Sequence, residues 1–199
     1  MPIEKKYQLW LNEPTMKDYL KEELLKMDED QKKEAFISDL EFGTGGLRGL
    51  LGAGTNRMNV YTVRKTSQGY ANYLAKDPKN KQKGIAIGYD NRHFSKEFAS
   101  EVAGVFAANG FKVYLFSELR PTPMLSYAIR YYGCAGGVMI TASHNPKEYN
   151  GYKVYNFSGA QLDVREADEA ILEVNKIKDY FDINVLDESD LIIPILDEV

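Results

Sequence analysis

Two hydrophobic patterns alternate through the middle of the chain. Short apolar, β-branched runs are typical of buried strands, and longer stretches with apolar positions three or four residues apart are typical of helices. The predicted strands cover residues 85–89, 111–116 and 136–141. The predicted helices cover residues 60–75, 95–109 and 123–132. Because strands that alternate with helices favour a parallel sheet, we expect a three-layer α/β/α domain with a mixed, mostly parallel sheet and additional amino-terminal helices.

Local signals refine the element boundaries. Ser95 is suited to cap the helix that follows it. Residues 152–155 predict a short strand that pairs antiparallel at an edge of the sheet. Asp163 and Glu166 predict a capping box at the start of a helix that runs to about Tyr180.

The flanks of the α/β series have different patterns. Residues 16–40 are charged and amphipathic, which predicts two helices. Residues 41–59 are rich in glycine without sustained periodicity, which predicts a long loop. The last residues alternate between acidic and apolar. We therefore expect a helical leader over residues 1–40 packed on an α/β domain over residues 41–181, followed by a linker toward further domains over residues 182–199.

Polar residues follow three successive predicted strands. Asp90, Arg120 and Ser143 each come shortly after a strand ends. Ligands of open α/β sheets gather at the carboxyl ends of the strands. We therefore expect these three residues to lie along one rim of the sheet.

The most informative part of this rim is the turn around Ser143. The apolar strand runs directly into a polar turn that holds the serine beside a histidine, and the following residues are rich in lysine, tyrosine and glycine. A serine hydroxyl is a poor nucleophile until a neighbouring group takes its proton, and phosphoserine carries nearly two negative charges. Because cations lie nearby in the sequence, we interpret Ser143 as a phosphoryl carrier.

Each candidate also has an ordinary structural interpretation. A serine after a strand is usually a turn residue that makes a local hydrogen bond. His144 is consistent with a surface histidine, Lys153 with an exposed strand lysine, and Arg48 with a residue that solvates a glycine-rich loop. Arg92 follows Asp90 in a run that is ordinary turn chemistry, so Arg92 is not among the predicted catalytic residues.

Two linked motifs carry a resemblance to a known family. Residues 141–146 read Thr-Ala-Ser-His-Asn-Pro, and residues 150–153 read Asn-Gly-Tyr-Lys. Together they resemble the active-serine signature of the α-D-phosphohexomutase superfamily. Residues 42–49 resemble the family's amino-terminal arginine-glycine loop, and residues 88–92 its first-strand exit. With the helical leader, the chain is most similar to domain I of the bacterial phosphoglucomutase/phosphomannomutase group, in its phosphopentomutase-like branch.

The resemblance implies an enzyme of the isomerase class that moves a phosphate between hydroxyls of one sugar. Ser143 would be the phosphoserine, and one of its phosphate oxygens would bind Mg²⁺. Lys153 would be the general acid or base for the sugar hydroxyl, His144 would assist proton transfer or contact the substrate, and Arg48 would orient the phosphoserine. The implied substrate is a hexose phosphate, glucose 1-phosphate or glucose 6-phosphate, with glucose 1,6-bisphosphate as the activator.

The same family builds its active site from four domains, of which this chain resembles the first. The family's aspartate-rich Mg²⁺ loop, sugar-recognition loop and carboxyl-terminal phosphate loop find no match in this sequence. We therefore expect the carboxylate ligands of Mg²⁺ to lie outside this chain and the remaining domains to be its partners. On its own, the 199-residue chain is expected to be inactive as a mutase.

Composition argues against several other classes. With 25 basic and 29 acidic residues the net charge is −4, and the basic residues are dispersed, so we expect no nucleic-acid partner and no binding to an anionic membrane. Cys134 is the single cysteine and fits a buried position in a reducing compartment. One cysteine and two histidines argue against a zinc site. Neither a signal peptide nor a membrane-spanning run is evident, so we expect a soluble, cytoplasmic protein.

Two alternatives stay open at this point. Within the enzyme class, the substrate could be mannose 1-phosphate or pentose 1-phosphate, because the sugar-recognition loop is not part of the chain. From another class, the chain could be a non-catalytic phosphosugar-binding domain that has kept the serine loop. The sequence does not decide the oligomeric state.

Overall fold

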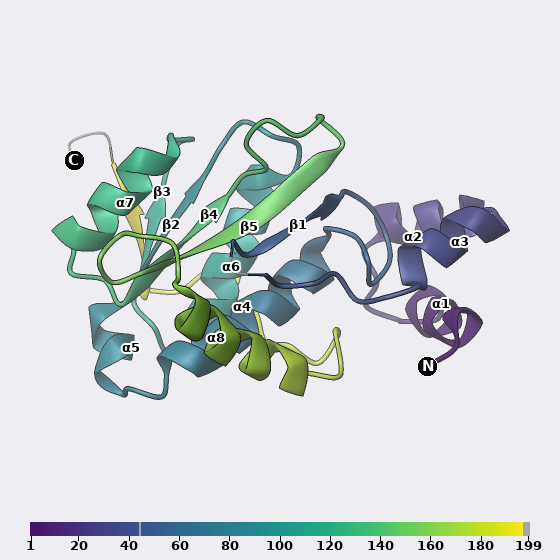
Figure 1. The fold of residues 1–199 in the computed structure, drawn as a ribbon, viewed down its shortest axis with the longest axis horizontal. Helices are drawn as coiled ribbons and strands as arrows, with labels where there is room; N and C mark the ends of the chain where they lie inside the picture. The colour runs from purple at the N-terminus through teal and green to yellow at the C-terminus, as the bar shows by residue number, and fades with distance from the viewer. Residues whose placement is uncertain (44, 197–199) are drawn as a thin grey trace.

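A six-stranded sheet forms the centre of the computed structural model, which describes residues 1–43 and 45–196 (Figure 1). The strand order is β1-β5-β4-β2-β3-β6. The strands are β1 Leu47–Leu50, β2 Ile85–Tyr89, β3 Val113–Phe116, β4 Gly136–Ile140, β5 Tyr149–Asn156 and β6 Ile192–Ile195. Strand β2 pairs parallel with β3 and β4, β3 pairs parallel with β6, and β5 pairs antiparallel with β1 and β4. The predicted mixed, mostly parallel sheet is confirmed.

Helices cover both faces of this sheet. The helices are α1 Ile3–Leu11, α2 Asp18–Lys26, α3 Glu29–Phe36, α4 Val60–Leu74, α5 Lys79–Lys83, α6 Ser95–Ala108, α7 Thr122–Tyr131 and α8 Val164–Lys176. Helix α7 packs on one face, and the layer of α4, α6 and α8 packs on the other. Alternate residues of the central strands β2, β3 and β4 therefore enter two separate apolar clusters, as the two-residue period of a strand requires. The three-layer prediction is confirmed.

The amino-terminal helices lie at the β1 end of the molecule, opposite β6 (Figure 1). Trp10 of α1 is only 3% exposed and joins this group to the rest of the protein. Its ring makes edge contacts with Phe36, Tyr61, Tyr180 and Phe181, at centroid distances of 5.8, 5.7, 5.6 and 5.4 Å. Such aromatic pairs add to the free energy gained by burying their surface. One indole thus ties α1 to α3, to α4 and to the segment after α8.

The segment predicted as a long loop, residues 41–59, contains strand β1. The strand is short and glycine-rich, and its pairing partner β5 lies about a hundred residues later, so the local pattern gave no strand signal. Gly46 shows why glycine is needed before it. This residue has φ 98°, and an added Cβ would lie 1.8 Å from the carbonyl oxygen of Tyr152. Only glycine allows the backbone to approach β5 this closely.

Three other elements differ from their predictions. Strand β5 is longer than predicted and lies between β1 and β4 instead of at an edge. Helix α8 ends at Lys176, before the predicted end. The carboxyl-terminal residues, which we expected to form a linker, include edge strand β6. Pro194 lowers the strand signal of that segment, yet an edge strand tolerates a residue that cannot donate to a ladder.

Two smaller predictions are confirmed, and two helices were not located by the sequence pattern. The capping box is present, because Asp163 Oδ1 accepts from the Glu166 backbone N–H at 2.8 Å and Glu166 Oε2 accepts from that of Asp163 at 3.0 Å. Cys134 is buried, and burial raises the pKa of its thiol to about 12. Helix α1 lies within the predicted helical leader but was not placed individually, and the short helix α5 was not predicted. Within the described residues, no helix is long and apolar enough to cross a membrane.

The crossing of α4 and α8 depends on Gly69. A Cβ at this position would lie 2.4 Å from Cγ2 and 2.5 Å from Cα of Val174. Glycine-to-alanine changes inside a helix normally stabilise by about 0.5–1 kcal/mol. Here the overpacking reverses the sign, so Gly69→Ala should lower the free energy of unfolding by about 1–3 kcal/mol, measured by urea denaturation. Gly45→Ala, with no atom within 4 Å of its Cβ, is the control. A Gly69→Ala protein as stable as wild type would contradict this packing.

Candidate active site

Ser143 stands in a turn just beyond the carboxyl end of β4. Its backbone is in the left-handed region with φ 53°, and its backbone N–H donates to Thr141 Oγ1 at 3.1 Å. The serine side chain is exposed. Left-handed backbone is uncommon for residues other than glycine, and such residues cluster at functional sites. The turn thus presents an accessible hydroxyl at the rim of the sheet.

Lys153 lies on β5 opposite Met139 of β4 and points at this hydroxyl. Its Nζ donates a hydrogen bond to Ser143 Oγ at 3.0 Å. Partial burial lowers the pKa of Lys153, and the charge of Arg48 lowers it further, while Asp90 acts in the opposite direction. A lysine with a lowered pKa exchanges its proton more readily near neutral pH. The pair can therefore move a proton to or from the serine oxygen.

Arg48 approaches the same turn from β1. It lies opposite Gly151, and because residues 151 and 153 lie on the same face of β5, Arg48 shares that face with Lys153. Its Nη1 donates to Asn145 Oδ1 at 2.8 Å. Two cations from two neighbouring strands thus flank the serine loop, defined here as residues 143–149. An anionic group on Ser143 would meet positive charge on this side.

His144 is the predicted site residue with the fewest contacts. It follows Ser143 directly and is exposed. Its ring makes no hydrogen bond or ion pair with any residue in the described part of the chain. The structure therefore brings together Ser143, Lys153 and Arg48, and leaves His144 facing solvent beside them.

The predicted rim is confirmed by backbone contacts at the strand ends. The Asp90 N–H donates to the Ile140 carbonyl at 3.2 Å, and the Arg120 N–H donates to the Tyr89 carbonyl at 3.0 Å. The segments that follow β2, β3 and β4 therefore adjoin one another at one edge of the sheet.

Arg92 is a site residue that the sequence interpretation left out. Its guanidinium donates to backbone carbonyls of the serine loop, including that of Ser143 at 2.8 Å. Its position on the rim, two residues after Asp90, was the available signal. That signal is weak, because Asp-Asn-Arg runs are common in turns. Ser95, which we expected to cap α6, is instead the first residue of this helix, and its hydroxyl donates to Asp90 Oδ1 at 2.8 Å.

The described residues do not complete a magnesium site by themselves. Mg²⁺ prefers six oxygen ligands and is usually held by carboxylates together with phosphate oxygens. Among the described residues, no group of three or more carboxylate, histidine or cysteine side chains could hold a metal ion. A phosphate on Ser143 could supply one oxygen ligand to such an ion.

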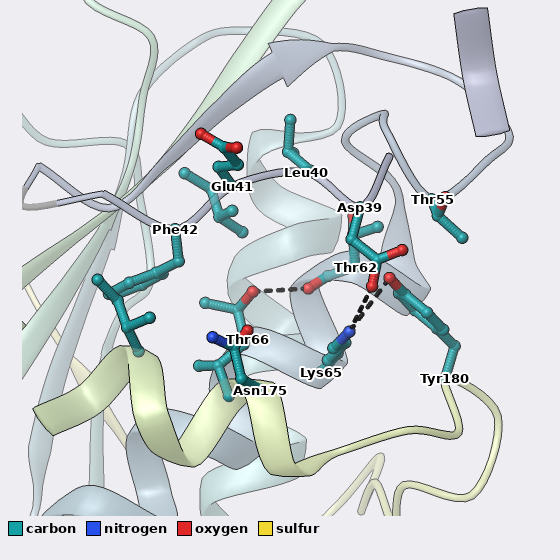
Figure 2. A pocket seen from close by; sticks show the side chains of 13 residues that line it. Asp39, Leu40, Glu41, Phe42, Thr55, Thr62, Lys65, Thr66, Asn175 and Tyr180 are labelled. Carbon is teal, nitrogen blue, oxygen red and sulfur yellow. Dashed lines mark hydrogen bonds and ion pairs between the residues drawn. The ribbon is translucent and has the colours of Figure 1, made fainter. Parts of the chain in front are cut away.

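A separate pocket of about 310 Å³ lies between the end of the leader, α4 and α8 (Figure 2). Lys65 points into it, and its Nζ donates to Asp39 Oδ2 at 3.0 Å and to Tyr180 Oη at 3.2 Å. Burial, together with the charge of Asp39, raises the pKa of Tyr180. The 13 lining residues include none of the four predicted site residues. Lys65 therefore joins the end of the leader to α4 and to the segment after α8.

The family described as phosphoglucomutase/phosphomannomutase, alpha/beta/alpha domain I, matches residues 39–181. The chain belongs to this family. This match confirms the phosphoglucomutase/phosphomannomutase family that the serine motif predicted. Membership in the family suggests Mg²⁺ as the metal.

Individual relatives of this phosphoglucomutase/phosphomannomutase domain are longer proteins. A phosphoglucomutase from Staphylococcus haemolyticus is 44% identical over 154 residues, which is 77% of this chain and 28% of the relative. A phosphoglucomutase from Staphylococcus aureus is 38% identical over 181 residues, or 89% of this chain and 32% of the relative. The open form of the phosphoprotein pp63/parafusin from Paramecium, a phosphoglucomutase, superimposes with a TM-score of 0.59 at 28% identity and covers 71% of this chain and 26% of that one. The chain thus spans less than a third of these relatives.

The charge of Arg48 acts directly on Lys153, and this effect is testable. A neighbouring cation disfavours the protonated lysine, so Arg48→Gln should raise the pKa of Lys153. The pKa is measured by an NMR titration of the lysine side chains, with Lys153→Arg to assign the signal. Arg165→Gln is the control, because Arg165 is exposed and pairs with Glu169 on α8. An unchanged or lower pKa in Arg48→Gln would show that Arg48 does not act on Lys153.

Proposed function

We propose that this chain is the phosphoserine-carrying domain of a phosphoglucomutase that interconverts glucose 1-phosphate and glucose 6-phosphate. The observation that carries the proposal is the 3.0 Å hydrogen bond from Lys153 Nζ to the exposed Ser143 Oγ. The family match over residues 39–181 supports the reaction class. The relatives named phosphoglucomutase support glucose phosphates as substrates.

The proposed reaction has two phosphoryl transfers. Phosphoserine 143 gives its phosphoryl group to the free hydroxyl of a hexose monophosphate: the bond from phosphorus to Ser143 Oγ breaks, and a bond to the sugar oxygen forms. The sugar hydroxyl loses its proton to a base, the departing Ser143 Oγ takes up a proton, and the product is glucose 1,6-bisphosphate. After the bisphosphate reorients, its other phosphoryl group returns to Ser143 Oγ. The enzyme is then regenerated and the sugar is isomerised.

The residues around Ser143 suit these steps. Phosphoryl transfer depends on positioning and on neutralising charge at the transferred oxygens. Lys153 is the proposed proton carrier, because it lies within hydrogen-bond distance of the oxygen that gains or loses phosphate. Arg48 is proposed to orient the phosphoserine from β1. His144, exposed beside Ser143, is proposed to contact the substrate or assist proton transfer.

The rest of the enzyme is proposed to lie beyond this chain. The 39–181 match and the short coverage of the relatives support a domain I over residues 41–181 with a packed leader over residues 1–40. Mg²⁺, which supplies charge neutralisation at the phosphate when bound, would take its carboxylates from other domains. Because those groups are missing, the 199-residue chain by itself should not turn over substrate. The buried single cysteine is compatible with a reducing, cytoplasmic location.

A second candidate is a closely related specificity. The matching family includes phosphomannomutases, so mannose phosphates are the alternative substrates. Pentose phosphates, which the phosphopentomutase-like branch would use, are the third. A non-catalytic phosphosugar-binding role has less support, because Lys153 is hydrogen-bonded to the serine oxygen as a proton carrier should be.

The carrier role of Ser143 is tested in the full-length parent enzyme. Ser143→Ala removes the oxygen that accepts phosphate, so turnover should fall by at least about 10⁴-fold, as for other enzyme nucleophiles. A coupled assay would supply glucose, mannose, ribose and deoxyribose 1-phosphates with Mg²⁺ and bisphosphate. Ser100→Ala, an exposed serine on α6, is the control and should keep full activity. Retained activity in Ser143→Ala would remove the carrier role.

The role of Lys153 is tested by two substitutions with different charges. Lys153→Met removes both the charge and the proton, and kcat should fall by about 10²–10³-fold. Lys153→Arg keeps the charge but cannot give up its proton, so it should be nearly as impaired. Lys26→Met, an exposed lysine on α2, is the control. A drop below about tenfold in Lys153→Met would show that Lys153 only lines the site.

A further inference from the structure

One side chain, that of Arg92, donates hydrogen bonds to four backbone carbonyls of the serine loop. Arg92 Nη1 donates to the carbonyls of Pro146 at 2.9 Å and Tyr149 at 3.0 Å. Arg92 Nη2 donates to the carbonyls of Ser143 at 2.8 Å and Asn145 at 2.6 Å. A guanidinium has four N–H groups on its two Nη atoms, and here each can serve one carbonyl. The side chain of Arg92 is only 13% exposed.

Arg92 is itself fixed by a second layer of contacts. Its backbone N–H donates to Asp90 Oδ1 at 3.0 Å, and its Nε lies 3.8 Å from Asp90 Oδ2. The Ser95 hydroxyl donates to the same Asp90 Oδ1, and the buried Asn150 donates to Ser95 Oγ at 3.0 Å and to the His93 carbonyl at 2.9 Å. Asn150 belongs to β5, so this network links the segment after β2 to the strand that carries the site lysine.

We infer that Arg92 is the positioning residue that fixes the serine loop so that the Ser143 hydroxyl faces Lys153. The inference rests on the proposed function of Ser143 as the phosphoryl carrier. Arg92 bonds the carbonyl of Ser143 itself and carbonyls at three further points along residues 145–149. A left-handed serine persists only where surrounding contacts determine its conformation. Arg92 supplies those contacts without pointing any of its donors at the reacting oxygen.

Lysine cannot replace this arginine. A lysine has three N–H donors on a single nitrogen, whereas the guanidinium spreads its donors over a planar fork. A lysine at position 92 could therefore not donate to all four carbonyls at once. Arg92→Lys keeps the positive charge at the site, so it separates the geometry of the fork from electrostatics. If positive charge alone mattered, Arg92→Lys would behave as wild type.

The test uses the full-length parent enzyme with the variants Arg92→Lys, Arg92→Ala and Ser95→Ala, and Arg165→Lys as the exposed control. Two readouts are made on each protein. Hydrogen exchange reports how well the amides of residues 144–149 are ordered, whether or not the enzyme turns over. Steady-state kinetics separate kcat from KM for glucose 1-phosphate. Exchange in strands β2 and β4 reports whether the fold is intact.

The expected result is local. In Arg92→Lys and Arg92→Ala, the loop amides should exchange faster while the strands stay protected, and kcat should fall by about 10²-fold with little change in KM, as for a misplaced reacting group. Guanidinium ion should partly restore kcat in Arg92→Ala and not in Arg92→Lys. In Ser95→Ala the rise in loop exchange and the fall in kcat should be smaller. Arg165→Lys should match wild type in both.

Two results would overturn the inference. One is wild-type kcat in Arg92→Lys. The other is unchanged hydrogen exchange of the loop amides in Arg92→Lys and Ser95→Ala. Both substitutions are conservative enough for the fold to stay intact, and exchange in strands β2 and β4 checks this in the same samples. Absence of wild-type turnover on every sugar phosphate would instead overturn the proposed function, and loop exchange in the same samples would still decide whether Arg92 fixes the loop.

Discussion

The antiparallel pairing of β5 with β4 is the constraint on which the site depends. The chain leaves β4, turns through the serine loop and returns along β5 in register, with Met139 opposite Lys153. This return brings Lys153 back to Ser143, ten residues earlier in the chain. On its other side β5 pairs with β1, and this pairing places Arg48 beside the serine loop. The two pairings of β5, with β4 and with β1, therefore bring a serine and two cations together from separate segments of the chain.

The electrostatics of the assembled site favour an anion. Arg48 and Lys153 approach the loop from the sheet, and Arg92 fixes the loop from the segment after β2. Asp90 is a neighbouring carboxylate, and it is occupied by Arg92 and Ser95. A phosphate on Ser143 would find positive charge but few metal ligands among the described residues. These features suit the proposed role of Ser143 as a phosphoryl carrier.

The amino-terminal helices pack against α4 and against the segment after α8. Trp10 packs against aromatic rings on α3, α4 and the segment after α8. Lys65 and Asp39 form an ion pair at the point where the leader joins α4 (Figure 2). These contacts fix the end of the leader just before β1 begins. Because β1 carries Arg48, the stretch of chain that the leader contacts hold in place leads directly into the candidate site.

The sequence alone determined what could be decided by local pattern. Buried strands β2 and β4 with helices between them follow from apolar periodicity, and the motif around Ser143 identified the family and made Ser143 the proposed phosphoryl carrier. The same patterns did not reveal β1, β6 or Arg92. The pairing of β1 and β6 is set by partners far along the chain, and the donors of Arg92 serve backbone carbonyls, which every residue has. Only the tertiary structure decided these features, because hydrogen bonds between distant segments depend on register and approach and leave no periodic signal in the sequence.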